Sequence, residues 1–234
     1  CNSIWHYRTS SKLTIPNGVE CLASVGGNSS YKIKQIILPN SLKTIDYGVF
    51  FISANLSKII FPNSVASINQ EAFFRSGIKK AKFGKGLTYI GPESFRKCEN
   101  LKYISLPKKL KKIDYCAFKG CQKLKKVKIL STNTNISFQV FSRCSNLKSV
   151  TINGVIEIDS GAFYNCKKLS KVKIGNKKKA PKIEKNAFKN TKKGIKFYVK
   201  NKRVAKSLKK QLKGSGVKKA KILVGKKVIY KNVK

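Results

Sequence analysis

The chain has 234 residues, and 41% of them are hydrophobic, which suits one elongated domain with a small terminal module. Its 52 Lys and Arg side chains outnumber nine Asp and Glu, so the formal net charge of +43 should attract polyanions, less so as salt rises. No apolar run is long enough to span a membrane. Because the chain starts at Cys1 and contains no methionine, we expect a processed or trimmed product from which the signal peptide and anchor are missing.

The sequence repeats with a nearly constant period. A degenerate unit begins near Leu13, contains Pro16 and has Gly27 where later units have phenylalanine. The phenylalanine then recurs at intervals of 23, 22, 23, 23, 22 and 25 residues, at Phe50, Phe73, Phe95, Phe118, Phe141, Phe163 and Phe188. An isoleucine keeps the same intervals, at Ile45, Ile68, Ile90, Ile113, Ile136, Ile158 and Ile183. A fixed period in this range predicts a solenoid, whose end repeats are often atypical.

Each unit contains a short stretch in which apolar and polar residues alternate, such as Val127-Lys128-Ile129. This period of two predicts a short, half-buried strand. The strands of stacked units should form a parallel sheet with neighbours about 4.8 Å apart. The phenylalanines should form an internal column of packed rings.

The last forty residues break the period and predict a different structure. Ile195 to Val199 reads as a final strand, and Asn201 can cap a helix whose Val204, Leu208 and Leu212 share one face, ending near Gly214. Residues 217–224 and 227–230 predict a hairpin around Gly225. We therefore divide the chain into a repeat domain of about eight units (1–199) and a helix-plus-hairpin cap (200–234). The alternative is that these last residues form a separate binding module.

The unit from Leu101 to Leu124 reads Leu-x2-Ile-x-Leu-Pro-x2-Leu-x2-Ile-x3-Ala-Phe-x2-Cys-x2-Leu. It resembles the BspA-type (Treponema pallidum-type) leucine-rich repeat, and the resemblance runs from about Leu13 to Val199. Departures are local: Gly77-Ile78 shortens one unit, 130–135 replaces the proline-containing loop, and 177–182 adds basic residues. The resemblance implies a leucine-rich repeat solenoid, a horseshoe of mostly short parallel β-strands with little helix. It also implies a secreted or cell-surface protein of bacteria or parasitic protists that acts in adhesion and protein binding.

Four of the seven cysteines share one repeat position, three residues after phenylalanine: Cys98, Cys121, Cys144 and Cys166. Other units have Ser53, Ser76 and Thr191 there, so we expect small, buried, free thiols whose S–H groups reach backbone carbonyls. Parallel Cβ vectors disfavour disulfides within this column, and ligands spread along an axis disfavour a metal site. Cys1 and Cys21 could form a disulfide or remain free, and Cys116, which reads as outward-facing, would be the odd thiol.

The acidic residues offer no catalytic pair. Asp46, Asp114, Asp159 and Glu184 each follow the second isoleucine at a turn position, and Glu71 and Glu93 stand two residues before phenylalanine. Glu20, Glu99 and Glu157 have no repeat explanation, and the one histidine, His6, has no repeat partner. No nucleophile with its base, no facing carboxylates and no Gly-rich phosphate loop is visible. We expect no enzyme, no cofactor and no metal.

The residues on either side of the first isoleucine of each strand should point outward and form two exposed columns. The candidates for partner binding are Lys58, Lys80, Lys82, Tyr103, Lys126, Lys128, Lys171 and Lys173. The alternative is a solvated ladder of lysines without a partner.

We expect a monomeric, non-enzymatic adhesion module, extracellular or at the cell surface, that binds a protein or acidic glycan of a host or bacterial surface. One alternative is a nonspecific binder of nucleic acid or sulfated glycan, for which Tyr103 is the single stacking platform on the exposed strand positions. Another is a structural spacer within a larger surface protein.

Overall fold

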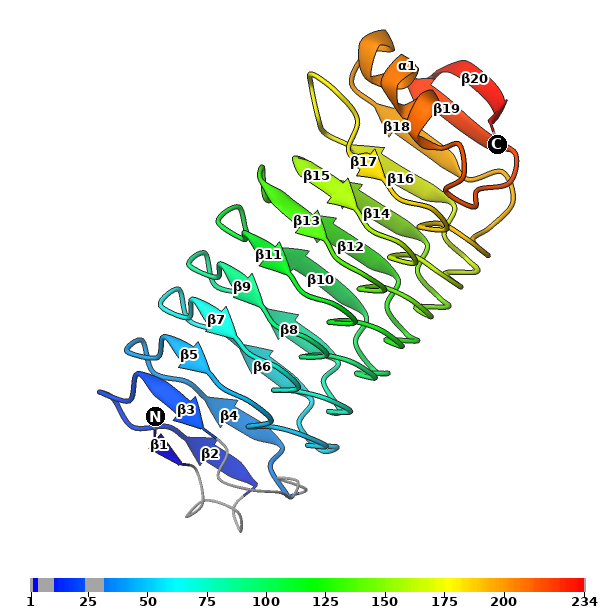
Figure 1. Cartoon of the computed structure of the whole chain (residues 1–234). Helices are drawn as coiled ribbons and strands as arrows, with labels where there is room; N and C mark the ends of the chain where they lie inside the picture. The colour runs from blue at the N-terminus through cyan, green and yellow to red at the C-terminus, as the bar shows by residue number, and fades with distance from the viewer. Residues whose placement is uncertain (1, 4–10, 24–31, 234) are drawn as a thin grey trace.

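The computed structural model describes residues 2–3, 11–23 and 32–233, which form an elongated solenoid of stacked turns (Figure 1). The first strands lie at one end of the stack, and the helix and last hairpin lie at the other. The solenoid of short parallel strands predicted from the period is confirmed. Three residues on which predictions rest, Cys1, His6 and Gly27, lie outside the described part of the chain.

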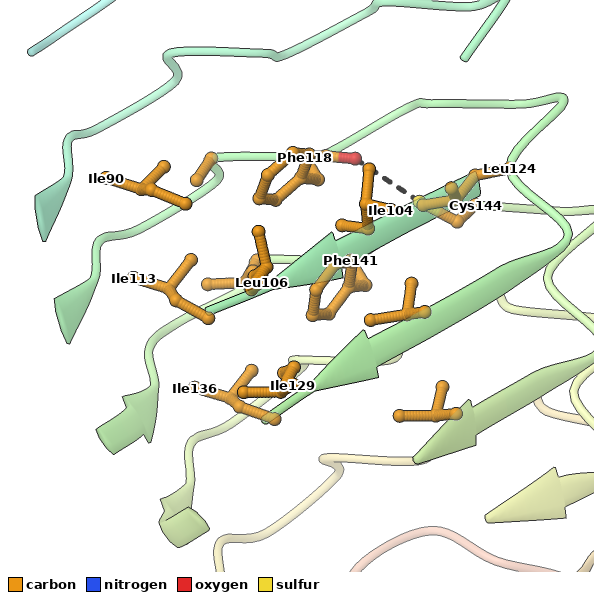
Figure 2. Packing of buried hydrophobic residues seen from close by; sticks show 14 of the residues in the cluster. Ile90, Ile104, Leu106, Ile113, Phe118, Leu124, Ile129, Ile136, Phe141 and Cys144 are labelled. Atoms are coloured by element: carbon orange, nitrogen blue, oxygen red, sulfur yellow. Dashed lines mark hydrogen bonds between the residues drawn. The ribbon is translucent and has the colours of Figure 1, made fainter. Parts of the chain in front are cut away.

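One side of the solenoid is a parallel sheet in the order β1-β3-β5-β7-β9-β11-β13-β15-β17. Its strands are very short: β1 (Asn2–Ser3), β3 (Cys21–Ala23), β5 (Thr44–Ile45), β7 (Ser67–Ile68), β9 (Tyr89–Ile90), β11 (Lys112–Ile113), β13 (Thr134–Ile136), β15 (Val155–Ile158) and β17 (Lys182–Ile183). The second isoleucine of each unit lies in these strands and points into the core, as Ile90, Ile113 and Ile136 do in Figure 2.

The other side consists of two sheets. The first is parallel, in the order β2 (Lys12–Thr14), β4 (Gln35–Ile37), β6 (Lys58–Ile60) and β8 (Lys80–Lys82). The second runs in the order β10 (Tyr103–Leu106), β12 (Lys126–Ile129), β14 (Ser149–Ile152), β16 (Lys171–Ile174), β18 (Lys196–Val199), β19 (Ala220–Val224) and β20 (Lys227–Val233). Among the described residues, strand pairing on this side is therefore interrupted between β8 and β10.

The phenylalanine column is a continuous stack of buried rings. Consecutive rings from Phe50 to Phe188 have centroids 5.0 to 5.5 Å apart, and each ring is at most 1% exposed. Figure 2 shows Phe118 and Phe141 enclosed by the aliphatic side chains of the neighbouring strands. The predicted internal column is confirmed, and it explains why a unit this short folds only against its neighbours.

Each of these turns has two residues in the left-handed backbone region, two positions before and two positions after the phenylalanine. The first set is Gly48, Glu71, Glu93, Cys116, Gln139, Gly161 and Asn186. The second set is Ile52, Arg75, Lys97, Gly120, Arg143, Asn165 and Asn190. This conformation costs an L-residue about 1–2 kcal/mol, so packing of the enclosed phenylalanine must hold the turn in shape.

The cysteine column behaves as predicted. Each thiol donates a hydrogen bond to the carbonyl of the phenylalanine one turn earlier, at 3.1 to 3.2 Å: Cys98 to Phe73, Cys121 to Phe95, Cys144 to Phe118 and Cys166 to Phe141. The bond from Cys144 is drawn in Figure 2. All four thiols are buried and free, so each satisfies a carbonyl in the interior of the turn stack.

The other cysteines differ from this column. Cys116 was predicted to face outward, and that is wrong: its side chain is 6% exposed, and Glu93, Arg96 and Lys119 lie near enough to act electrostatically on its thiol. Burial accordingly raises the pKa of its thiol. Cys21 is disulfide-bonded, and its bonding partner lies outside the described residues.

The C-terminal residues form a helix and extend the seven-stranded sheet by β19 and β20. Helix α1 (Lys202–Gln211) begins after Asn201, whose side chain accepts a hydrogen bond from the Val204 N–H at 2.9 Å. Leu208 in the helix and Leu212 at its end are both buried. Strand β19 pairs in parallel with β18 and antiparallel with β20, so the predicted helix and hairpin are both present. The Asn186 and Phe188 N–H groups of the last repeat bond to the Gly214 and Ser215 carbonyl oxygens at 3.0 and 2.8 Å, so the residues after α1 continue the hydrogen-bonded stack beyond that repeat.

Candidate functional site

The outward side of the even-numbered strands from β4 to β18 carries the residues that the sequence singled out, and we call this surface the lysine face. Strand register places Lys58 beside Lys80 in the four-stranded sheet. In the seven-stranded sheet, one outward column is Tyr103, Lys126, Ser149, Lys171 and Lys196. The other is Ser105, Lys128, Thr151, Lys173 and Tyr198. The predicted candidates therefore share one side of the solenoid.

The two sheets of this side separate between β8 and β10. The connection from Phe73 to β8 is one residue shorter than its neighbours, because Ile78 follows Phe73 by five residues whereas Leu101 follows Phe95 by six. The Lys102 N–H reaches the Lys79 carbonyl oxygen at 3.4 Å, whereas the equivalent bond one turn later measures 2.9 Å. Strand β8 therefore continues the ladder from β6, but among the described residues it does not pair with β10.

A groove of about 930 Å³ opens at this interruption, and we call it the β8–β10 groove. Its apolar lining residues are Ala81, Phe83, Pro107 and Leu130, which we call the floor, and Tyr103 also lines it. Ala81 pairs with buried Ile59 but is itself half-buried, because its side chain is too small to fill the inward column. The volume lies within the range typical of pockets that bind small molecules.

Lysines form the rim of this groove. Lys79, Lys80, Lys82 and Lys85 come from the β8 turn. Lys102, Lys108 and Lys109 come from the β10 turn. All seven are exposed, and no acidic side chain lines the groove. The positive charges therefore come from the turns on both sides of the groove. The low dielectric constant of the apolar floor strengthens the electric field of these lysines.

The structure brings three of the eight sequence candidates, Lys80, Lys82 and Tyr103, together in this groove. Lys58 lies in a separate, smaller depression of about 330 Å³ with Ile37 and Ile60. The remaining candidates lie farther along the seven-stranded sheet, where Lys171 also sits 4.8 Å from the ring centroid of Tyr198.

Sequence reasoning missed the five other rim lysines because they precede or follow the strands. It also missed Tyr198 as a second aromatic residue of the lysine face. The sequence signal that could have located the groove was the shortened unit at Gly77-Ile78, together with Ala81 at a position where other units have isoleucine or valine.

The acidic side chains serve local structure. Asp114 accepts hydrogen bonds from the Tyr115 N–H at 2.9 Å and the Tyr89 hydroxyl at 3.0 Å, and Lys112 lies 2.7 Å away. Partial burial acts to raise the pKa of Asp114, but these partners outweigh it and the pKa is lowered. Lys182 bridges Glu157 and Glu184 at 2.8 and 2.6 Å.

Within the residues that the structure describes, no three His, Cys, Asp or Glu side chains are grouped so that they could hold a metal ion. A search of the same residues for a helix long and apolar enough to cross a membrane finds none.

Two solved structures resemble this chain in fold. The pneumococcal vaccine antigen PcpA is 20% identical, with a TM-score of 0.62 over 92% of this chain and 68% of that chain. The T. pallidum leucine-rich repeat protein is also 20% identical, with a TM-score of 0.59 over 92% of this chain and 88% of that one. No curated protein matches.

A model of the BspA type leucine rich repeat region matches in six copies, over residues 6–102 and 68–196. The same residues carry the ring column, the thiol column and the lysine face. The chain belongs to the BspA-type leucine-rich repeat family.

Proposed function

We propose that this protein is a non-enzymatic binding or adhesion module of the bacterial surface, and that the lysine face receives an acidic protein partner. The observation that carries the proposal is the β8–β10 groove, in which seven lysines surround an apolar floor and no acid lines the walls. An apolar centre with a charged rim is the usual arrangement of a protein-binding site.

The surrounding lysine face supports the same partner. Lys126, Lys128, Lys171 and Lys173 extend the positive surface along β12 and β16, so a partner could contact several turns at once. Such a field accelerates encounter with acidic surfaces and disfavours basic ones. Solenoids generally offer this kind of long surface to their partners.

The test begins with an array of matrix proteins, sulfated glycans and nucleic acids, probed at low salt and at about 150 mM salt. A hit is then measured with the face variant, in which Lys126, Lys128, Lys171 and Lys173 are all changed to Glu. The matched control changes Lys178, Lys179, Lys192 and Lys193 to Glu, four exposed loop and turn lysines off the lysine face. We expect the face variant alone to lose binding; equal loss in both variants would contradict a defined face.

The second candidate function is nonspecific binding of polyanions such as nucleic acid or sulfated glycan. The observation in its favour is that 25 basic residues follow Ser170, with Glu184 as their only acidic counterpart. Such binding should disappear by about 150 mM salt and should depend on total charge, whichever lysines are changed. The two salt concentrations of the array separate it from a defined site.

A further inference from the structure

We propose that the β8–β10 groove holds one bulky apolar side chain of the partner, supplied by an extended peptide segment with carboxylates on both sides of that residue. This rests on the proposed function and adds to it the chemistry of the bound segment. The partner would be recognised by an apolar anchor within an acidic sequence.

Three departures from the repeat coincide in the turn that forms the groove. Gly77 lies so close to the preceding turn that an added Cβ would be 1.8 Å from the Ala54 carbonyl oxygen. Gly84 stands where neighbouring units have proline, and an added Cβ there would be 2.1 Å from the Pro62 carbonyl oxygen. Ala81 stands where the paired strand has Ile59. Gly77 and Gly84 let this turn approach the preceding turn closely, and Ala81 leaves out the side-chain volume that an isoleucine would occupy. Together these two features leave the groove open.

The floor of the groove is rigid. The Phe83 ring stacks on Phe61 at 5.2 Å and packs edge-on against Phe95 at 5.6 Å. Both partners are buried, so the floor is held by the core. Tyr103, which is 41% exposed, adds an aromatic surface beside it. A preformed apolar site binds a side chain without first having to become ordered.

The arrangement of the lysines selects among anionic ligands. Four come from the β8 turn and three from the β10 turn, so the positive groups flank the floor on two sides. An acidic peptide can place carboxylates on both sides of a central apolar residue. A fatty acid has one anionic end and would leave one group of lysines unpaired. Nucleobases carry polar edges that this apolar floor could not pair.

The experiment is fluorescence anisotropy with a labelled acidic peptide that has one central phenylalanine, compared with the same peptide carrying alanine at that place. We expect the phenylalanine peptide to bind at least about tenfold more tightly, because a buried aromatic side chain contributes that much or more. Ala81→Ile should reduce this difference, because it adds side-chain volume at the floor of the groove, and it should leave the affinity of the alanine peptide unchanged. The matched control is Val127→Ile, the same kind of change in the intact ladder, which should leave both affinities unchanged.

Ala81→Ile is to be checked by its unfolding midpoint, and Ala81→Val replaces it if it does not fold. Equal affinities of the two peptides would overturn the anchor proposal, yet the proposed function would survive if the four lysine-to-glutamate changes still abolished partner binding. Laurate binding at the groove that displaces the peptide and is lost in Ala81→Ile would overturn the peptide assignment in favour of an anionic amphiphile. If neither peptide binds, the anchor proposal is likewise overturned.

Discussion

Removing one ring from the middle of the phenylalanine column should destabilise the whole array. Phe118 is fully buried between Phe95, at 5.1 Å, and Phe141, at 5.5 Å, with interplanar angles of 6° and 11°. Phe118→Ala removes both contacts and leaves a cavity that rigid neighbouring turns cannot close. A buried Phe→Ala change costs about 3–5 kcal/mol, and we expect the upper half of that range because two aromatic pairs are lost at once.

The assay is urea unfolding followed by circular dichroism, with the midpoint and the slope fitted separately. Phe138→Ala is the matched control, because it deletes the same ring from a position that is 48% exposed. Its midpoint should shift little. Phe50→Ala should fall between the two, because among the described residues Phe50 stacks on Phe73 alone. Equal midpoints for Phe118→Ala and Phe138→Ala would refute the column as the source of stability.

The remaining predictions concern the thiols and one glycine. Native protein at pH 8 should not react with a thiol reagent at its five described free cysteines, whereas urea should expose them, and fast native labelling of the column would contradict burial. Burial raises the pKa of Cys98 from 9.0 to about 12. Between these two values the folded state keeps a proton that the unfolded state releases. The free energy of unfolding should therefore fall by up to about 1.4 kcal/mol per pH unit as the pH rises from about 9. Cys98→Ser gives this position the serine that the preceding unit has at Ser76, and it should show a shallower decline above pH 9; an identical decline would contradict a contribution from Cys98. Gly77→Ala should cost roughly 1–3 kcal/mol or prevent folding, because its Cβ would meet the Ala54 carbonyl oxygen at 1.8 Å; an unchanged unfolding midpoint would contradict the close packing at Gly77.

The repeat period predicted those parts of the fold that every turn shares. Phe118 and Cys121 could be placed from sequence because each has counterparts one period away, and a shared position must have a shared environment in a stacked array. The same reasoning failed for Cys116. Its counterparts Glu93 and Gln139 have long polar side chains and are half-buried, whereas Cys116 is 6% exposed, so the shared position did not predict the burial of a side chain this short.

The groove could not be predicted from the period because it arises where the period is broken. The one-residue deletion before β8 was visible, but its effect on strand pairing depends on how the shortened turn packs against Ala54 and Pro62 in three dimensions. The rim lysines that were missed, such as Lys85 and Lys108, lie beyond the strands in turns whose direction the alternating pattern does not determine.

The two sources of affinity at the groove respond differently to salt, which makes them separable. Lysine–carboxylate attraction across exposed groups is screened over about 8 Å at physiological ionic strength, so it should weaken alike for the phenylalanine and alanine peptides. Burial of the ring against Phe83 is not screened. The ratio of the two affinities should therefore stay constant while both affinities fall with salt. A ratio that collapses toward one would mean that the ring only adjusts how carboxylates meet lysines, whereas a constant ratio assigns it to the apolar floor that Ala81 leaves open.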